Sequence, residues 1–430
     1  MRVQKLDESV KKEVLSILKQ RGEGGSTDVE KIVGDILEDV KKRGDAALFE
    51  YTERFDKTKV DAGSVRVSAK EMEEAFERVG DDFRKILKKA AERIREYHKM
   101  QLRRSFFETA EDGSILGQRI TSIENAGVYV PGGKAAYPSS TLMNIIPAKV
   151  AGVKKIVVCT PPGKDGKIND AILAAAYVAG ADEVYKAGGA QAIAAMAFGT
   201  ESIPRVDKIV GPGNIFVALA KKSVYGAVSI DSVAGPSEIL VLADESADPE
   251  FVAADLLSQA EHDEMASAIL ITTDETLGDK VLARIGAFLP ERSRRAIIEK
   301  SLEDYGFILV AKDMDEALDM VNLVASEHLE ILTKEPWTVM PKVKNAGAIF
   351  LGPYSCEPLG DYMAGPNHVL PTGGSARFFS PLSVDDFIKK SSIIAFSKEG
   401  LGALIDDIDA FAMAEGLDAH AESARIRKGL

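Results

Sequence analysis

The spacing of apolar residues separates a helical amino-terminal region from a longer region in which short apolar strands alternate with helices. Val10, Val14, Leu15 and Leu18 fall on one face of an expected helix over residues 10–21. A Gly-rich segment, residues 22–27, interrupts this pattern. Residues 28–42 and 69–103 again show helical periodicity, with charged residues at the outward positions. The chain is therefore expected to begin with helices.

The pattern changes at Ile115, after which apolar segments of strand length alternate with Ala-rich helical segments. The expected strands are Ala126–Val130, Lys155–Cys159, Glu183–Lys186, Lys208–Val210 and Val228–Ile230. The expected helices are Thr141–Ala151, Asp170–Ala179, Ala190–Ala197 and Ile215–Lys222. Such alternation predicts right-handed βαβ units in a mostly parallel sheet.

A second block of alternating strands and helices follows. Its expected strands are Ile239–Ala243, Ala268–Thr272, Phe307–Val310 and Gly347–Leu351, and its expected helices include Asp279–Phe288, Pro290–Ser301 and Met314–Ala325. Two such blocks indicate that one architecture occurs twice, with a ligand bound between the copies.

We therefore expect an α/β fold with two Rossmann-like domains, each incomplete and doubly wound, plus helical extensions at both ends. The expected divisions are an N-terminal helical extension (1–25), a first α/β domain (26–125 and 239–381), a second α/β domain (126–238) and a C-terminal helical tail (382–430).

Small-residue turns follow the expected strands of the first block: Pro131-Gly132-Gly133, Pro161-Pro162-Gly163, Gly188-Gly189-Ala190 and Gly211-Pro212-Gly213-Asn214. Glycines there let a backbone approach a diphosphate, and the helix N-termini that follow favour its charge. None spells G-x-G-x-x-G, and the turn at Gly211 departs from that pattern at Phe216. Nucleotide binding is thus one interpretation, and ordinary βα turns are the other.

Residues 353–381 show little periodicity, yet their aromatic and apolar content argues against disorder. An irregular segment of this length inside an enzyme is usually functional. It contains Asp361, His368 and Arg377.

Composition excludes several classes of protein. The 430-residue chain has a formal net charge of −13, which argues against a nucleic-acid binder. It contains no apolar run long enough to span a membrane, and its start does not resemble a signal peptide. Cys159 and Cys356 lie far apart in unlike contexts, which fits a reduced, cytoplasmic location better than a disulfide framework or a zinc ribbon.

The segment LLSQAEHD, residues 256–263, provides the first chemical signal. On a helix, Asp255, Gln259 and His262 project from one face. A carboxylate, an amide and an imidazole on one face suit a helix that lines a cleft, although a solvated helix end is the simpler alternative.

The histidines strengthen this signal. Only five are present, and four lie in the second half beside an acidic or amide residue: His262 with Gln259, His328 with Glu327, His368 after Asp361, and His420 after Glu415. Imidazole and carboxylate together suit metal binding or proton transfer, so we expect a metal or acid/base centre assembled from distant segments. His98, at the end of a long charged helix, is expected to be a surface or partly packed residue.

Six separated motifs resemble the histidinol dehydrogenase family across nearly the whole chain. They are Gly-Pro-Gly-Asn (211–214), Ala-Gly-Pro-Ser-Glu (234–238), Ser-Gln-Ala-Glu-His-Asp (258–263), Glu-His-Leu-Glu (327–330), Gly-Asp-Tyr with Gly-Pro-Asn-His (360–368), and Glu-Gly-Leu-x-x-His ending at 420.

The resemblance implies zinc- and NAD-dependent oxidation of L-histidinol to L-histidine through the aldehyde. It assigns the implied roles as follows: zinc ligands Gln259, His262, Asp361 and His420; proton acceptors Glu327 and His328; further substrate contacts Ser237, His368 and Glu415; NAD contacts Tyr129, Gln191 and Asn214. The metal and catalytic residues would belong to the first α/β domain and the NAD loops to the second. It also implies one zinc per subunit and a homodimer in which Glu415 and His420 complete the partner's site.

Some positions keep alternatives. Without the resemblance, Asp255, Glu261 or Asp263 would be preferred to Gln259 as a ligand, because an amide oxygen binds zinc weakly. Glu327 could form only a local cap or pair, and Ser237 beside Pro236 could be a turn residue.

Two other functions fit part of the pattern. A zinc-dependent hydrolase would use the same histidines, but it has no need of the glycine loops. A nucleotide-binding regulator would use the loops, but it has no need of four paired histidines. Formation of NADH from histidinol, with and without a chelator, separates the three.

Overall fold

The computed structural model describes residues 1–22, 27–132 and 136–428. Most of the expected break at 22–27, and Gly133 of the first glycine turn, lie outside these residues. The chain forms two compact units, one of residues 1–101 and 123–387 and the other of residues 102–122 and 388–430. The first unit contains two six-stranded sheets.

One sheet is formed mainly by the first predicted block, and its order is β2-β7-β6-β5-β8-β9. The strands are β2 (Arg66–Val67), β5 (Asn125–Tyr129), β6 (Lys155–Thr160), β7 (Glu183–Lys186), β8 (Lys208–Val210) and β9 (Ser229–Ile230). The central strand β5 pairs in parallel with both β6 and β8, whereas the edge strand β2 is antiparallel to β7.

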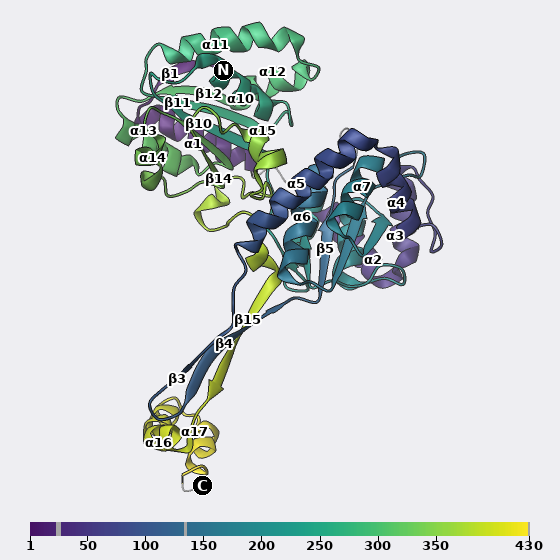
Figure 1. The fold of residues 1–430 in the computed structure, drawn as a ribbon, viewed down its shortest axis with the longest axis vertical. Helices are drawn as coiled ribbons and strands as arrows, with labels where there is room; N and C mark the ends of the chain where they lie inside the picture. The colour runs from purple at the N-terminus through teal and green to yellow at the C-terminus, as the bar shows by residue number, and fades with distance from the viewer. Residues whose placement is uncertain (23–26, 133–135, 429–430) are drawn as a thin grey trace. The chain divides into compact units, whose positions relative to one another are not determined.

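Helices cover both faces of this sheet (Figure 1). One face packs on α4 (Ala69–Arg78), α5 (Asp81–Lys99), α6 (Pro138–Ala151) and α7 (Asp170–Ala179), the other on α2 (Thr27–Arg43), α3 (Asp45–Asp56), α8 (Gly189–Phe198) and α9 (Ile215–Val224). Successive strand residues alternate between the faces: Val128 belongs to the first core and Tyr129 to the second.

The other sheet is parallel throughout, in the order β1-β12-β11-β10-β13-β14. Its strands are β1 (Val3–Lys5), β10 (Glu238–Ala243), β11 (Ser267–Thr272), β12 (Gly306–Val310), β13 (His328–Leu332) and β14 (Ala348–Leu351). The sequence also predicted four of these strands, but not β1 or β13. All residues of β10 to β13 are buried, as expected for a sheet covered on both faces.

Two apolar cores cover this sheet as well. One contains residues of α1 (Glu8–Gly22), α13 (Met314–Val324) and the short α14 (Pro336–Val339), and the other contains residues of α10 (Pro249–Ala260), α11 (Leu277–Phe288) and α12 (Arg295–Tyr305).

Both sheets place the first strand of their block at the centre, β5 between β6 and β8, and β10 between β11 and β13. The expected α/β fold with two Rossmann-like domains is confirmed. The glycine turns follow the carboxyl ends of β6, β7 and β8. Glu238 and His328 instead begin β10 and β13, so they lie at the amino edge of their sheet.

The structure differs from the expected division of the chain. Helices α2 to α5 pack on the sheet that contains β5, and not on the sheet that contains β10. The first residues are not a separate extension, because β1 pairs with β12 and α1 packs on the same sheet. A helical pattern shows which face is buried but not what it is buried against.

The expectation for His98 was wrong. The ring is fully buried in α5, and its Nδ1 lies 2.7 Å from the carbonyl oxygen of Ile94. Its Nε2 lies 3.4 Å from the side-chain nitrogen of Asn367, which donates to the carbonyl of Met143 at 2.6 Å. His98 therefore packs beneath the segment that carries His368.

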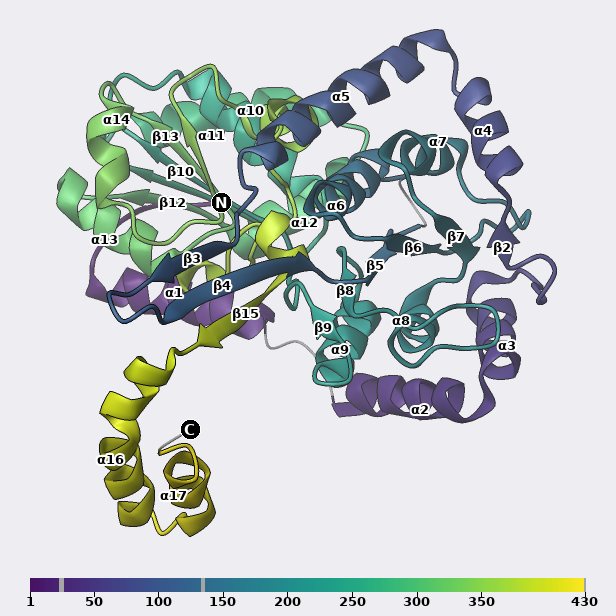
Figure 2. The same cartoon turned by 60° about the horizontal axis from the view of Figure 1, so that its bottom comes forward.

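The second unit contains a three-stranded antiparallel sheet, β15-β4-β3, and two helices (Figure 2). Its elements are β3 (Phe106–Thr109), β4 (Ile115–Ser122), β15 (Ile388–Ala395), α16 (Lys398–Ala414) and α17 (Asp418–Arg425). The expectation of an all-helical tail was wrong for residues 388–395, because their pairing with β4 is not visible in the local pattern. In the described part of the chain, no helix has the length and apolar character needed to cross a membrane.

Candidate functional site

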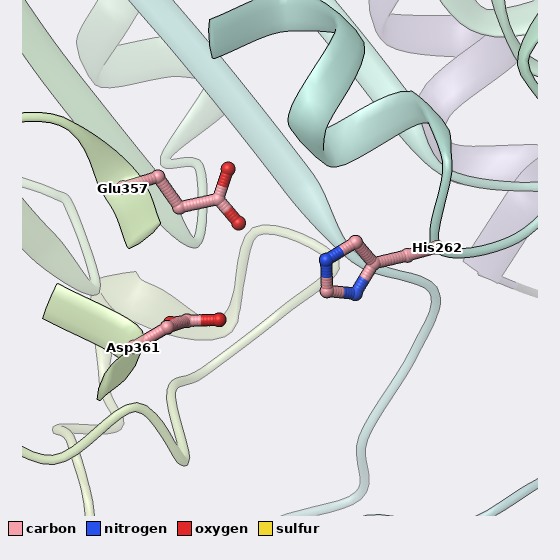
Figure 3. Close-up of side chains that lie close together, drawn as sticks. All are labelled: His262, Glu357 and Asp361. Atoms are coloured by element: carbon pink, nitrogen blue, oxygen red, sulfur yellow. The ribbon is translucent and has the colours of Figure 1, made fainter. Parts of the chain in front are cut away.

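Three side chains form a cluster suited to a metal ion (Figure 3). His262 follows α10, Glu357 lies in the helical turn α15 (Glu357–Leu359), and Asp361 lies in the π-helical turn Gly360–Ala364. One potential ligand atom from each lies within 4.8 Å of the others. His262 is exposed, Asp361 is half-buried and Glu357 is buried, so the cluster is accessible from one side.

Local structure accounts for this arrangement. The side chain of Asp248 caps α10 by accepting the backbone N–H of Glu250, and Pro249 occupies the first turn, where no donor is needed. The helix ends at Ala260, so His262 lies just beyond it, although a helical position was predicted. Glu357 and Asp361 are four positions apart on consecutive helical turns, which brings both carboxylates to one face.

Gln259 is fully buried beside this cluster. With its amide nitrogen facing them, it lies 3.2 Å from Glu357 Oε1, 3.2 Å from the carbonyl oxygen of Glu238 and 3.0 Å from Nδ1 of His328. The carbonyl can only accept, which places the amide nitrogen on its side. The amide oxygen, the atom that could bind a metal, therefore points away from these acceptors.

His328 begins β13 and Glu327 directly precedes it, beside Glu238 at the start of β10. The backbone N–H of Glu238 donates to Glu327 Oε2 at 2.9 Å, and the backbone N–H of Glu327 donates to Glu238 Oε2 at 3.3 Å. Burial raises the pKa of Glu327 well above its usual range. Two buried carboxylates thus hold the amino ends of neighbouring strands together.

The two ring nitrogens of His328 have different surroundings. Nδ1 lies 3.0 Å from the carbonyl oxygen of Glu238, which accepts from the ring in the tautomer that carries its proton on Nδ1. Nε2 is buried, has no hydrogen-bond partner among the described residues, and lies 3.9 Å from Asp361 Oδ1. Burial lowers the pKa of His328 to about 4, so the ring is neutral at pH 7 and its Nε2 can accept a proton.

Further acids surround Glu357. Its backbone N–H donates to Glu330 Oε1 at 2.9 Å, and the Ser258 hydroxyl donates to its Oε2 at 2.8 Å. Burial, reinforced by the charge of Asp361, raises the pKa of Glu357 to about 8. Burial also raises the pKa values of Glu330 and of the adjacent Asp255, so a proton is retained between them.

His368 connects the cluster to helix α6. Its Nδ1 donates to the carbonyl oxygen of Asp361 at 3.1 Å, and its Nε2 lies 3.1 Å from the Ser140 hydroxyl. The first contact fixes the tautomer, so Nε2 accepts from Ser140. His368 thereby helps to hold the turn that carries Asp361.

A cavity of about 300 Å³ opens beside the cluster, and both His262 and Asp361 line it. Its other walls come from α5, from residues 136–142 at the start of α6, from Tyr362 and Met363, and from the charged side chains of Glu261 and Arg294. This volume and its largely apolar walls suit a small organic molecule.

The expected NAD contacts lie at the carboxyl ends of the other sheet. The Tyr129 hydroxyl accepts the backbone N–H of Gly189 at 3.1 Å, and burial raises the pKa of Tyr129 to about 12. Gln191 is buried, and neither atom of its amide has a hydrogen-bond partner among the described residues. Asn214 is exposed and caps α9 by accepting the N–H groups of Phe216 and Val217.

The structure brings six of the twelve expected site residues together. Contacts link Gln259, His262, Glu327, His328, Asp361 and His368 through one network. Ser237 precedes Glu238, and its carbonyl accepts the N–H of Ser267 at 3.0 Å. Glu415 and His420 belong to the second unit, where both are exposed, and their roles stay predictions.

Three residues of this network were not predicted: Ser140, Glu238 and Glu357. The spacing of Glu357 and Asp361 was a usable signal, but it fell in a segment without visible periodicity. Glu238 belongs to the Ala-Gly-Pro-Ser-Glu motif, but a buried acid at the start of a strand has no sequence pattern of its own. Ser140 meets His368 across 228 positions, a contact that no local pattern encodes.

Comparison with known proteins identifies the family. The family model described as histidinol dehydrogenase matches residues 19–428. Histidinol dehydrogenase from Clostridium acetobutylicum is 54% identical over 410 residues, covering 95% of each chain, and that from Bacillus subtilis is 53% identical over 411 residues, covering 96% of each. The crystal structure of histidinol dehydrogenase from Elizabethkingia anophelis superposes with a TM-score of 0.94 at 40% identity, covering 99% of this chain and 98% of that one. The chain therefore belongs to the histidinol dehydrogenase family.

Proposed function

We propose that this protein oxidises L-histidinol to L-histidine through the aldehyde, in two NAD-dependent steps with a zinc ion at the site. Membership of the family supports the substrate and the oxidoreductase class. The observation that carries the proposal is the free, buried Nε2 of neutral His328, placed 3.9 Å from Asp361 in the cluster with His262. It is a proton acceptor next to a candidate metal site and a cavity.

The side chains of the cluster fit zinc. Imidazole nitrogen and carboxylate and amide oxygens are all donors that Zn²⁺ accepts. We assign Gln259, His262 and Asp361 as ligands, together with His420, which is expected to come from the other subunit. When bound, the ion would hold the nitrogen atoms of the substrate and supply positive charge beside the alcohol.

Glu327 and His328 divide the proton transfers. His328 Nε2 takes the proton of the substrate alcohol in the first oxidation, because it is neutral and free. Glu327 takes a proton from the water that adds to the aldehyde, giving the hydrate that is oxidised in the second step. Its raised pKa makes the ionised carboxylate a stronger base. General-base catalysis of this kind contributes on the order of 10²–10⁴ in rate.

The end of β5 and the turns after β7 and β8 form the proposed NAD site, with contacts from Tyr129, Gln191 and Asn214. The amide of Gln191, which has no hydrogen-bond partner among the described residues, supports this assignment, because a buried polar group without a partner is costly unless a ligand satisfies it. When bound, NAD would accept the hydride in each step.

A homodimer with shared sites is also part of the proposal. The second unit leaves Phe106, Phe107, Leu116 and Ile394 each more than half exposed. So many exposed apolar side chains on a thin sheet favour burial against another chain. The dimer would allow Glu415 and His420 to reach the site of the partner subunit.

The direct test is absorbance at 340 nm after addition of histidinol and NAD, with and without a chelator. We expect NADH to form, to be lost on chelation and to return with zinc. A zinc hydrolase or a nucleotide-binding regulator would form no NADH. Absence of NADH formation would therefore contradict the proposal.

The division of labour is tested by two variants. His328→Asn should slow oxidation of the alcohol strongly, whereas Glu327→Gln should impair oxidation of the aldehyde more. Equal losses of both half-reactions in both variants would remove this assignment.

A further inference from the structure

Arg21 is a buried arginine at the end of the first helix, far in sequence from the site. Its side chain is 1% exposed. Nη1 donates to the carbonyl oxygens of Met265 at 2.9 Å and Ser237 at 3.3 Å, and Nη2 pairs with the carboxylate of Glu238. The guanidinium also lies 5.8 Å from the ring centre of Tyr305. Arg21 thus joins α1 to the start of β10.

The Glu238 carboxylate that Arg21 holds is itself bound to the catalytic segment. Its Oε2 accepts the backbone N–H of Glu327 at 3.3 Å, and its Oε1 accepts the N–H of Gly373 at 3.2 Å. In return, Glu327 Oε2 accepts the N–H of Glu238. The carbonyl of Glu238 receives the Nδ1 proton of His328. One residue therefore fixes the backbone of Glu327 and the tautomer of His328.

Charge explains why an arginine is needed here. Glu238 is 4% exposed and Glu327 is 7% exposed, so two carboxyl groups share a dry environment. A buried carboxylate is strongly unfavourable without a cation and hydrogen bonds. A planar guanidinium also presents several donors at once, which matches the carboxylate and two carbonyls that surround it.

We propose that Arg21 is a positioning residue for the acid/base pair Glu327 and His328, acting through Glu238. This inference rests on the proposed function, because it assumes that these two residues move protons. The amino-terminal helix is then part of the catalytic apparatus, although its sequence offers no catalytic motif.

The expected effect is on turnover. A misplacement of about 1 Å in a catalytic group can cost about 10²-fold in rate. We expect Arg21→Met to lower kcat by about 10²-fold with little change in KM, because no substrate contact is removed. The kcat of Arg21→Lys should lie between those of Arg21→Met and the wild-type protein, since an ammonium restores the charge but not the planar set of donors. Guanidinium at millimolar concentration should restore part of the activity of Arg21→Met but not that of Arg21→Lys.

A matched control is Arg78→Met. Arg78 makes a two-point ion pair with Asp170 at 2.8 and 2.7 Å, but on the exposed surface of α4. Its loss should leave kcat unchanged. Circular dichroism and gel filtration establish whether each variant is folded. If Arg21→Met does not fold, the kcat of Arg21→Lys provides the test instead.

A double variant tests the route through Glu238. If Arg21 acts through that carboxylate, Arg21→Met combined with Glu238→Gln should lose little more than Arg21→Met alone. A folded Arg21→Met enzyme with wild-type kcat, or losses that multiply in the double variant, would overturn the inference. Failure of the wild-type protein to reduce NAD with histidinol would instead refute the proposed function.

Discussion

Glu357 predicts a measurable release of protons when zinc binds. The side chain is 2% exposed, its carboxylate accepts the Ser258 hydroxyl, and it lies within 4.8 Å of possible ligand atoms of His262 and Asp361. Burial raises its pKa to about 8. A divalent cation beside the carboxylate should reverse this effect and expel the proton.

The magnitude follows from the pKa. At pH 7 a group with a pKa of about 8 is about 0.9 protonated, and at pH 9 it is about 0.1 protonated. Zinc binding at pH 7 should therefore release about 0.9 more protons from the wild-type protein than from Glu357→Gln, which has no proton to lose. At pH 9 the difference should fall to about 0.1.

The raised pKa of Glu357 also sets the direction in which the stability of the folded protein changes with pH. Because the pKa is raised in the folded state, the stabilising contribution of this proton is complete below about pH 4.5 and is lost as the pH rises through about 8. The metal-free wild-type protein should thus lose thermal stability over that range more steeply than Glu357→Gln.

Isothermal titration calorimetry with zinc in buffers of different ionisation enthalpy measures the protons released. Glu299→Gln, on the outer face of α12, is the control and should behave as wild type. Equal proton release by wild type and Glu357→Gln at pH 7 would refute the reasoning.

Three further outcomes follow from the geometry. Lys221→Met should cost about 3–5 kcal/mol, seen as a lower melting temperature, because it leaves the buried Asp231 carboxylate without its cation. It should also weaken NAD binding in a fluorescence titration, because Asp231 holds the backbone N–H of Gly211 at 2.8 Å. Gly211→Ala should raise the Kd for NAD as well, since Gly211 has φ +115° and a Cβ there would overlap the carbonyl oxygen of Tyr129; an unchanged Kd would contradict the assigned site. If His328 is the base, kcat/KM for alcohol oxidation should fall on the acid side near pH 4, and a midpoint near 6.5 would argue against it.

Local pattern was enough to find most of the core. The strands and helices from residue 125 onward follow apolar periodicity closely, because each sheet is buried on both faces and tolerates few polar residues. Strand β13 was not predicted because Glu327, His328 and Glu330 interrupt its apolar run with buried functional groups. The polar residues of the candidate site therefore prevented prediction of the strand in which they lie.

Long-range contacts set the limit of prediction. Histidines beside acids indicated His262, His328, Asp361 and His368, which the structure does bring together. Arg21 and Glu238, in contrast, meet across 217 positions and belong to unremarkable local sequences. The sheet on which α2 to α5 pack could not be predicted either, because the apolar face of an amphipathic helix does not identify the sheet that it packs against.

The discontinuous make-up of the second unit has a practical consequence for shortened forms of the protein. Strand β4 lies between β3 and β15, so the hairpin of residues 106–122 depends on the far end of the chain for its remaining edge. Ending the polypeptide at Phe387 would strip eight residues of pairing from β4 and leave the half-exposed Leu116 beside open backbone groups. Unprotected edges of this kind recruit other chains. A shortened protein should therefore precipitate unless residues 102–122 are replaced by a short linker at the same time.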